Sequence, residues 1–226
     1  MTSPELRPTP AAPLRRDAPA PDPLDGAAFG EARRLITTRR HVSPRRLVEP
    51  GPTCAQLEAL LTLAAAAPDH GLLTPWRFVV VPPAQRARLG DAFARALVER
   101  DPGATLEQIE AAREKAQRAP LLLVAVACLG PREPDIPPLE RMVSMGAAIQ
   151  NLLLGAHAMG YGAGLTSGRA MDSAAMREAL ELADGEHAVC CISVGSVERA
   201  KPARRQRPQP ADFVRELGAT PPRAQG

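Results

Sequence analysis

The sequence predicts a fold that combines α-helices with β-strands around a buried core, and three local patterns carry this prediction. Thr53 and Gln56 form a capping box, which marks the beginning of a helix. Residues 121–128 are apolar without alternation, as is typical of a central strand that is covered on both faces. A helix predicted for about residues 139–159 is apolar on nearly every side, so it must be surrounded by protein.

Composition limits the classes of protein to which the chain can belong. Of its 226 residues, 45% are hydrophobic and only 3% are aromatic, so the core is expected to consist mainly of aliphatic side chains. The formal net charge of +3 is too small to indicate a polyanionic partner. The four cysteines form no C-x-x-C pair and three of them lie in apolar runs, so we expect buried, reduced thiols. Because no apolar stretch suits a transmembrane helix or a signal peptide, we expect a cytoplasmic protein without membrane contact.

The first part of the chain leads up to a basic loop and a capped helix. Residues 1–26 have no periodic apolar face, so we expect them to be disordered. A short helix is predicted for residues 27–38, and a loop with four arginines follows at residues 39–46. The capped helix is then expected to cover residues 53–67.

A loop at residues 68–75 is fixed by a proline at each end and joins the capped helix to a β-branched strand at residues 79–81. Sites are often built on loops that are held between rigid elements. The loop carries His70 and leads to Trp76, which is the only tryptophan of the chain. The alternative interpretation is that Trp76 is a core anchor and His70 a surface turn residue.

Further helices and a further strand are predicted in the second half of the chain. A helix is expected at residues 84–100, and a second capping box, Thr105 with Gln108, begins a helix with a charged, solvated face that ends near residue 118. Another helix is expected to run from its cap Asp172 to about residue 182. The last strand is predicted at residues 187–194.

Gly160 ends the long apolar helix, and a glycine-rich segment follows at residues 160–168. This segment is not a dinucleotide fingerprint, because Leu165 stands where the third glycine is required and a helix precedes it. Its glycines would let the backbone lie flat against a planar ligand, or would serve only a tight connection. The long helix itself is interpreted equally well as a subunit interface or as a core helix within one chain.

Other kinds of site find little support in the sequence. The four histidines are far apart and no Cys/His pair has ligand spacing, so no metal site is expected. The basic clusters at residues 39–46 and 199–207 lack interleaved aromatic residues, so nucleic-acid binding is not expected. Arginine forks pair well with a phosphate monoester, and these two clusters could meet over one phosphate.

Three motifs resemble a known family when they are taken together and in order. They are Arg39-Arg40-His41, the loop with His70 before Pro75-Trp76, and the glycine segment with Leu165-Thr166-Ser167. This set is similar to the FMN-dependent nitroreductase family, in particular its short single-domain branch. The resemblance covers about residues 33–217 and implies an α+β fold with a mixed β-sheet between helices and an intertwined homodimer with two FMN sites at its interface. We expect the FMN-binding domain at residues 27–217 and, because the end of the chain has no core pattern, a disordered tail at residues 218–226.

The resemblance also implies which residues bind the cofactor. The residues that would hold the FMN phosphate and ribityl chain are Arg39, Arg40 and His41, with Arg205 and Arg207 closing on the phosphate. The residues whose backbone would follow the isoalloxazine edge are Leu165, Thr166 and Ser167. His70 would reach the flavin of the partner subunit.

Three departures from the family pattern bear on this assignment. The family's serine in the first motif is His41 here, so only its backbone role carries over. The glutamine before Pro-Trp is Thr74, which can alter ring contacts or substrate access. The loop after His41 is two residues longer, which leaves open whether Arg45 or Arg46 lies near the N1/O2 edge of the flavin.

The activity that the resemblance implies is ping-pong oxidoreduction of a small-molecule acceptor. NADH or NADPH would reduce FMN at N5, and a nitroaromatic, a quinone or a similar electron-poor acceptor would then take the electrons. No side chain is named as catalytic, because the cofactor carries the chemistry. The alternatives are a flavoenzyme of the same fold with another acceptor, as in enone reduction or dehalogenation, and a non-catalytic FMN-binding or sensor protein.

Overall fold

The computed structural model describes residues 26–130, 135–198 and 206–218. The chain divides into two units after Thr38, and helix α1 (Ala27–Thr38) belongs to the first of them. This helix confirms the prediction for residues 27–38. The predictions for residues 1–25 and 219–226 lie outside the described residues.

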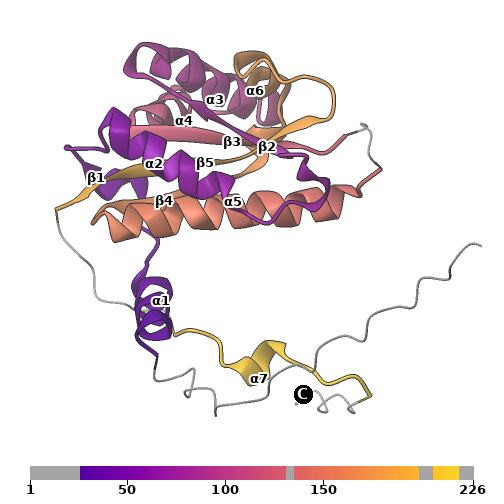
Figure 1. Cartoon of the computed structure of the whole chain (residues 1–226). Helices are drawn as coiled ribbons and strands as arrows, with labels where there is room; N and C mark the ends of the chain where they lie inside the picture. The colour runs from indigo at the N-terminus through magenta and orange to yellow at the C-terminus, as the bar shows by residue number, and fades with distance from the viewer. Residues whose placement is uncertain (1–25, 131–134, 199–205, 219–226) are drawn as a thin grey trace, which may run out of the picture. The chain divides into compact units, whose positions relative to one another are not determined.

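The second unit is built around a sheet of five strands (Figure 1). In spatial order the main path is β1 (Leu47–Val48), β5 (Glu186–Val197), β3 (Leu121–Cys128) and β2 (Trp76–Val80), and β4 (Gly162–Thr166) also pairs with β5. The four strand pairings are antiparallel. Parallel pairing is present as one isolated bridge, between His41 and Ala163.

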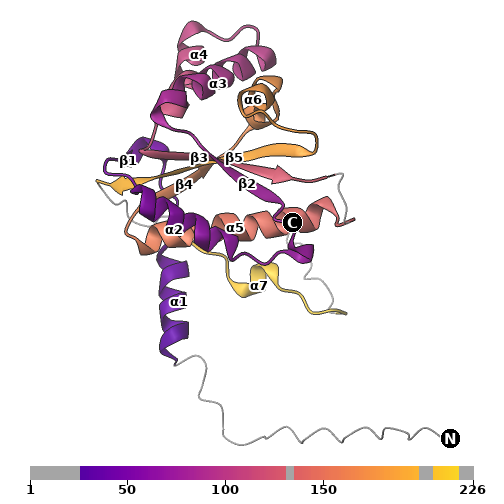
Figure 2. The same cartoon turned by 45° about the horizontal axis from the view of Figure 1, so that its top comes forward.

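Helices cover both faces of this sheet, as Figure 2 shows from a second direction. One face is covered by α2 (Cys54–Ala65) and α5 (Pro138–Ala158), and the other by α3 (Arg86–Arg100), α4 (Leu106–Arg113) and α6 (Ala174–Ala179). Short elements complete the chain: the 3-10 helices η1 (Pro44–Arg46), η2 (His70–Leu72), η3 (Pro83–Gln85), η4 (Glu114–Gln117) and η5 (Arg169–Asp172), and the helix α7 (Pro210–Phe213). The predicted α+β fold class is confirmed.

The central strand β3 explains why its sequence does not alternate. Leu123 and Ala125 lie in the core under α2 and α5, whereas Leu122 and Val124 lie in the core under α3, α4 and α6. All four are at most 2% exposed. Since both faces of the strand are buried, every position is apolar.

Both predicted capping boxes are present. The Thr53 side chain accepts a hydrogen bond from the Gln56 backbone at 3.3 Å, and the Gln56 side chain accepts one from the Thr53 backbone at 2.8 Å. Thr105 and Gln108 repeat this arrangement at the beginning of α4. Caps are visible in a sequence because both partners lie within one turn.

Residues Gly162–Thr166 of the glycine segment form strand β4, so the segment is more than a tight connection. A Cβ built at Gly162 would collide with the Val197 side chain, and one built at Gly164 would collide with the Val42 carbonyl oxygen. Glycine is therefore required where neighbouring chain segments press against β4. Its backbone lies against the chain itself, in the sheet.

Two boundaries also differ from the prediction. Ser173, and not Asp172, caps α6, because its side chain accepts a hydrogen bond from the Met176 backbone at 3.1 Å. Asp172 instead lies in η5. Helix α2 ends at Ala65, two residues before the predicted end.

Helix α5 packs closely on α2 but is not buried all round. A Cβ at Gly155 would come within 2.9 Å of Leu60, so this glycine allows the two helices to approach. On its other side, Val143 is 71% exposed and Leu139 is 80% exposed. One face of the helix therefore packs in the core of its own chain. Another face leaves apolar side chains exposed.

Candidate functional site

The first and third sequence motifs lie side by side in the structure. The Val42 backbone donates a hydrogen bond to the carbonyl oxygen of Ala163 at 2.9 Å, and His41 forms the parallel bridge to the same residue. Gly164 makes this approach possible, since a Cβ there would also lie 2.9 Å from the His41 ring. The arginine segment is thus fixed beside β4, although about 120 residues separate them in sequence.

Three guanidinium groups meet at Arg39. Arg207 donates a hydrogen bond to the Arg39 carbonyl oxygen at 2.9 Å, and Arg40 donates one to the same oxygen at 3.3 Å. Burial lowers the pKa of Arg39, and the positive charges of Arg207 and Arg40 lower it further. Arg205, the other predicted tail residue, lies outside the described residues.

The Nε atom of Arg39 is buried and has no hydrogen-bond partner among the described residues. A buried donor without an acceptor costs free energy. Three mutually repelling cations around such a donor form a site that an anion would stabilise. This arrangement fits the phosphate group that the sequence predicts for Arg39, Arg40 and Arg207.

A pocket of about 330 Å³ opens where β4 ends. Phe93, Leu122 and Met171 are among its apolar lining residues, and Thr166 and Ser167 line it from the strand end. The charged residues that line it are Arg45, Arg100, Lys115, Arg118 and Arg169, and no carboxylate lines it. The pocket is therefore strongly positive.

The cations of this pocket act on one another. Burial and the neighbouring Arg45 lower the pKa of Arg118, against a weaker opposing effect of Glu114. Burial lowers the pKa of Lys115, and Arg118 and Arg100 lower it further. Arg45, Arg118, Lys115 and Arg100 thus form a chain of neighbouring positive charges, and a bound anion would relieve their repulsion.

The structure also distinguishes the two arginines of the longer loop. Arg45 lines the pocket together with Thr166 and Ser167, whereas Arg46 is not among its lining residues. Arg45 is therefore the loop arginine that can act on a ligand in this pocket.

Of the three predicted residues in the third motif, two line the pocket and one does not. Thr166 and Ser167 line the pocket, and the Ser167 hydroxyl donates a hydrogen bond to the Val189 carbonyl oxygen at 2.7 Å. Leu165 is 37% exposed and is not a lining residue of the pocket. Its backbone is held by pairing opposite Ile192 in the sheet.

His70, the predicted residue of the second motif, lies outside the positive pocket. Its Nδ1 atom is 2.6 Å from the carboxylate of Glu140, in the first turn of α5, and His70 does not line the pocket.

Trp76 is only 7% exposed, so the interpretation of Trp76 as a core anchor is confirmed. Leu72 and Thr74 have φ angles of 54° and 46°, which side chains rarely adopt. Such strained loops occur preferentially at functional sites.

Four of the pocket cations were not predicted from the sequence. The helix that ends near residue 118 was expected to present a charged, solvated face; Lys115 is indeed exposed and Arg118 is partly buried, but both also line the pocket. Their spacing of three residues immediately before the central strand was the available signal. Arg100 and Arg169 carried no local signal, because only the fold brings them to the pocket.

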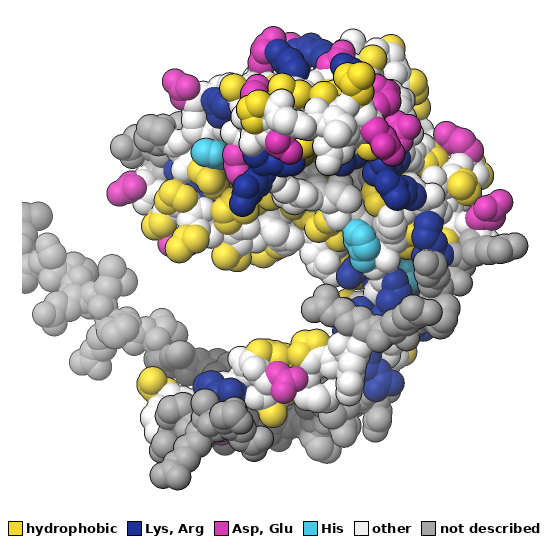
Figure 3. Space-filling model, turned by 180° about the vertical axis from the view of Figure 1, so that it is seen from behind, with side chains coloured by type: hydrophobic (Ala, Val, Ile, Leu, Met, Phe, Trp, Pro, Cys, Tyr) yellow, Lys and Arg dark blue, Asp and Glu magenta, His cyan; other side chains and the backbone are white. Residues whose placement is uncertain are grey.

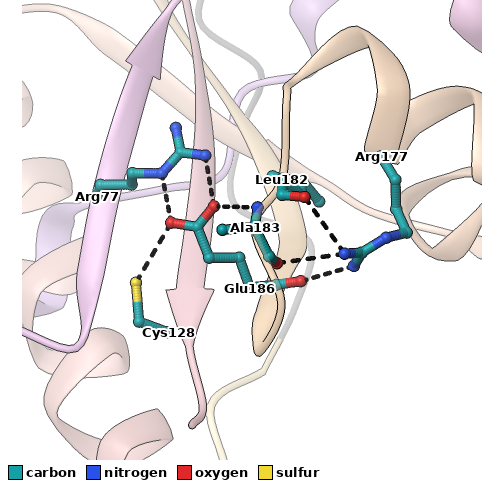
Figure 4. A network of polar contacts seen from close by, with 6 residues as sticks. All are labelled: Arg77, Cys128, Arg177, Leu182, Ala183 and Glu186. Carbon is teal, nitrogen blue, oxygen red and sulfur yellow. Dashed lines mark hydrogen bonds and ion pairs between the residues drawn. The ribbon is translucent and has the colours of Figure 1, made fainter. Parts of the chain in front are cut away.

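A second polar cluster lies at the far end of the sheet and is structural in character (Figure 4). Arg77 donates two hydrogen bonds of 2.7 Å to the Glu186 carboxylate, and this pairing lowers the pKa of Glu186 to about 2. The Cys128 thiol and the Ala183 backbone also donate to that carboxylate. Arg177 donates to the Glu186 carbonyl oxygen at 2.9 Å, so the cluster ties α6 to β5.

Residues 26–130, 135–198 and 206–218 contain neither a metal-binding cluster nor a membrane-spanning helix. No group of three His, Cys, Asp or Glu side chains in these ranges is arranged to hold a metal ion. Within the same ranges, no helix has the length and apolar character needed to cross a membrane.

Comparison with known proteins identifies the family. Residues 36–196 match the model of the nitroreductase family. A relative from Haemophilus influenzae, described as "Putative NAD(P)H nitroreductase", is 33% identical over 172 residues, which cover 76% of this chain and 91% of the relative. A relative from Escherichia coli K12, "Putative NAD(P)H nitroreductase YdjA", is 30% identical over 184 residues. These residues cover 81% of this chain and 98% of the relative.

Solved structures agree on the fold. The nitroreductase-like family protein from Bacillus cereus superposes with a TM-score of 0.71 at 22% identity, covering 82% of this chain and 95% of its own. A mutant of the FMN and NADPH-dependent nitroreductase NfnB from Sphigopyxis has a TM-score of 0.65 at 20% identity. The match covers 83% of this chain and 99% of the NfnB chain. The family match and the two relatives together show that the chain belongs to the nitroreductase family and is an oxidoreductase.

Proposed function

We propose that this protein is an NAD(P)H-dependent FMN oxidoreductase that reduces nitroaromatic, quinone or similar electron-poor acceptors by a ping-pong mechanism. One observation carries the proposal: β4 joins an arginine cluster with an unpaired buried donor to a positive pocket. The names of the relatives support NAD(P)H and the nitro acceptor, and the name of the NfnB structure supports FMN.

The arginine cluster would hold the phosphate end of the cofactor. Arg39 offers a buried Nε donor, and Arg40 and Arg207 gather around its carbonyl oxygen. Guanidinium groups bind phosphate oxygens in a bidentate manner. His41 would contribute through its backbone, which its bridge to Ala163 fixes.

The positive pocket would hold the ring of the cofactor. When bound, FMN supplies hydride acceptance and release at N5. Arg45, Lys115 and Arg118 would stabilise the negative charge that reduction places on the ring, because cations that line the pocket lie close to where this charge develops. The backbone at Thr166 and Ser167 would follow the ring edge, as the family resemblance implies.

We further propose that the protein works as a homodimer in which each site is completed by the other chain. Apolar side chains are exposed around α2, η2 and α5: Leu63 is 44% exposed, Leu72 89% and Val143 71%. Exposed apolar side chains that gather on one face are typical of an interface. In this arrangement His70 of the partner subunit would approach the flavin.

Steady-state kinetics test the proposed activity. Oxidation of NADH or NADPH should require a nitroaromatic or quinone acceptor, and double-reciprocal plots at several acceptor concentrations should give parallel lines. A sensor protein would retain FMN without any turnover. A same-fold flavoenzyme for another acceptor would oxidise the nicotinamide only when an enone or a halogenated compound is added. Either result would contradict the proposed function.

A further inference from the structure

The positive pocket differs from the other arginine-rich surface of the same helices. In the outer groove, Arg88, Arg95 and Arg113 each pair with a carboxylate, at distances of 2.7 to 3.0 Å. Acidic and basic side chains accordingly alternate along the top of the molecule in Figure 3, over α3, α4 and α6. The charges of that groove are therefore balanced within the protein.

The cations of the pocket are not balanced in this way. Among the described residues, no carboxylate lies within 4.0 Å of Arg45, Arg100, Lys115 or Arg169. Arg118 reaches Glu114 only at 4.0 Å. Lys115 instead lies 5.9 Å from the centre of the Phe93 ring, a cation–π contact that attracts its charge but does not neutralise it.

The pocket holds more positive charge than FMN would neutralise. The phosphate is assigned to the separate cluster at Arg39, and the reduced ring carries one negative charge. Arg45, Lys115 and Arg118 already provide three cations for that charge. Arg100, from the last turn of α3, and Arg169, from η5, remain without a partner in this assignment.

We propose that this pocket selects a ligand with an oxyanion of its own, and that Arg100 and Arg169 are the specificity residues that bind it. This inference rests on the proposed function and adds a substrate class to it. The oxyanion can come from two sources: a carboxylate on the electron acceptor, or the 2′-phosphate that distinguishes NADPH from NADH. Arginine pairs with both groups through the same fork of donors.

The test compares substrates that differ only in charge. kcat/KM is measured for 4-nitrobenzoate and for neutral 4-nitrobenzamide, and separately for NADPH and NADH, with the wild type and the double variant Arg100→Gln/Arg169→Gln. We expect one of the two ratios to fall about ten- to hundredfold in the variant, as for a lost charge-assisted hydrogen bond. The ratio that falls identifies the source. Comparing variant with wild type cancels the intrinsic reactivities of the two acceptors.

Two controls separate this role from a structural one. Arg95→Gln removes a cation from the same helix, but one that pairs with Glu178 in the outer groove, so both ratios should stay unchanged. Arg100→Lys keeps the charge at the end of α3 but loses the fork of donors, so it should retain part of the preference, whereas Arg100→Gln should retain less. If the double variant does not fold, the wild type still provides a test, because added salt should reduce its preference for the anionic substrate.

The outcomes distinguish the two proposals. Suppose that FMN content and turnover of 4-nitrobenzamide are normal. If the double variant then leaves both ratios unchanged, or if salt does not reduce the wild-type preference for the anionic substrate, the oxyanion proposal alone is overturned. A protein that binds no FMN, or oxidises neither nicotinamide with any acceptor, would overturn the proposed function and this inference with it.

Discussion

Glu186→Gln tests the polar cluster that ties the ends of β2, β3 and β5 together. The native carboxylate receives two hydrogen bonds from Arg77 at 2.7 Å, and its side chain is only 12% exposed. Glutamine keeps the shape and one acceptor but removes the charge. The change should therefore destabilise the fold without touching the positive pocket, whose lining includes neither residue.

The magnitude follows from the pKa of the carboxyl group. Pairing with Arg77 lowers the pKa of Glu186 from 4.5 to about 2, which corresponds to about 3 kcal/mol of unfolding free energy at neutral pH. Because the Arg77 side chain is 38% exposed, solvent screening reduces the expected loss to about 2 kcal/mol. In a chain of this size that loss lowers Tm by about 4–8 °C.

The pH dependence has a definite sign. The pKa of Glu186 is lower in the folded protein than in the unfolded chain. Its stabilisation is therefore present at pH values above the unfolded pKa of 4.5 and is lost as the pH falls toward the folded pKa of about 2. The difference between wild type and Glu186→Gln should be constant above about pH 5.5 and should shrink by more than half at about pH 3. Urea unfolding followed by circular dichroism, at one protomer concentration and one FMN loading, measures this difference.

Glu181→Gln is the matched control. It breaks an ion pair with Arg88 of 2.9 Å, but the two side chains are 78% and 49% exposed. Exposed pairs contribute less than about 1 kcal/mol. If Glu186→Gln cost no more than this control at pH 7, or if its cost stayed the same at pH 3, the structural role assigned to the cluster would be wrong.

Three further predictions concern the cofactor site. Gly164→Ala should cost about 1–3 kcal/mol of stability and weaken FMN binding, because the added Cβ collides with the arginine segment; unchanged FMN affinity would refute this link. A heterodimer of His70→Ala and Arg39→Ala chains should retain one near-normal FMN site, whereas two equally weakened sites would show that both residues serve the flavin of their own chain. Arg45→Gln should lower the flavin reduction potential by about 30 mV or more and Arg46→Gln should not, and equal effects in spectroelectrochemical titrations would contradict the assignment.

Local patterns allowed much of the fold to be predicted from the sequence. Capping boxes such as Thr53 with Gln56 involve residues in one turn, and the apolar run of β3 reflects its own burial. Strand β4 was missed because glycine is depleted in strands. Gly162 and Gly164 are acceptable there only because Val197 and Val42, distant in sequence, occupy the space beside them.

The site was predictable where a motif carries it. The arginine segment and Thr166 were expected to lie together, and the structure brings them to one strand end. Lys115 and Arg118 were missed although their spacing before the central strand was visible, since on a helix surface such residues look like ordinary solvated charges. Only the long-range packing that places them beside Arg45 makes them part of a pocket. The cross-subunit role of His70 stays a prediction.

The absorption spectrum of the purified protein shows whether this chain binds FMN at the arginine cluster. We expect a yellow protein with an oxidised-flavin spectrum, from which heat releases FMN and not FAD. Arg39→Ala should lower the bound FMN, because it removes the buried donor and the charge that would hold the phosphate. A colourless protein that does not take up added FMN, or one that releases FAD, would show that the chain is not an FMN oxidoreductase.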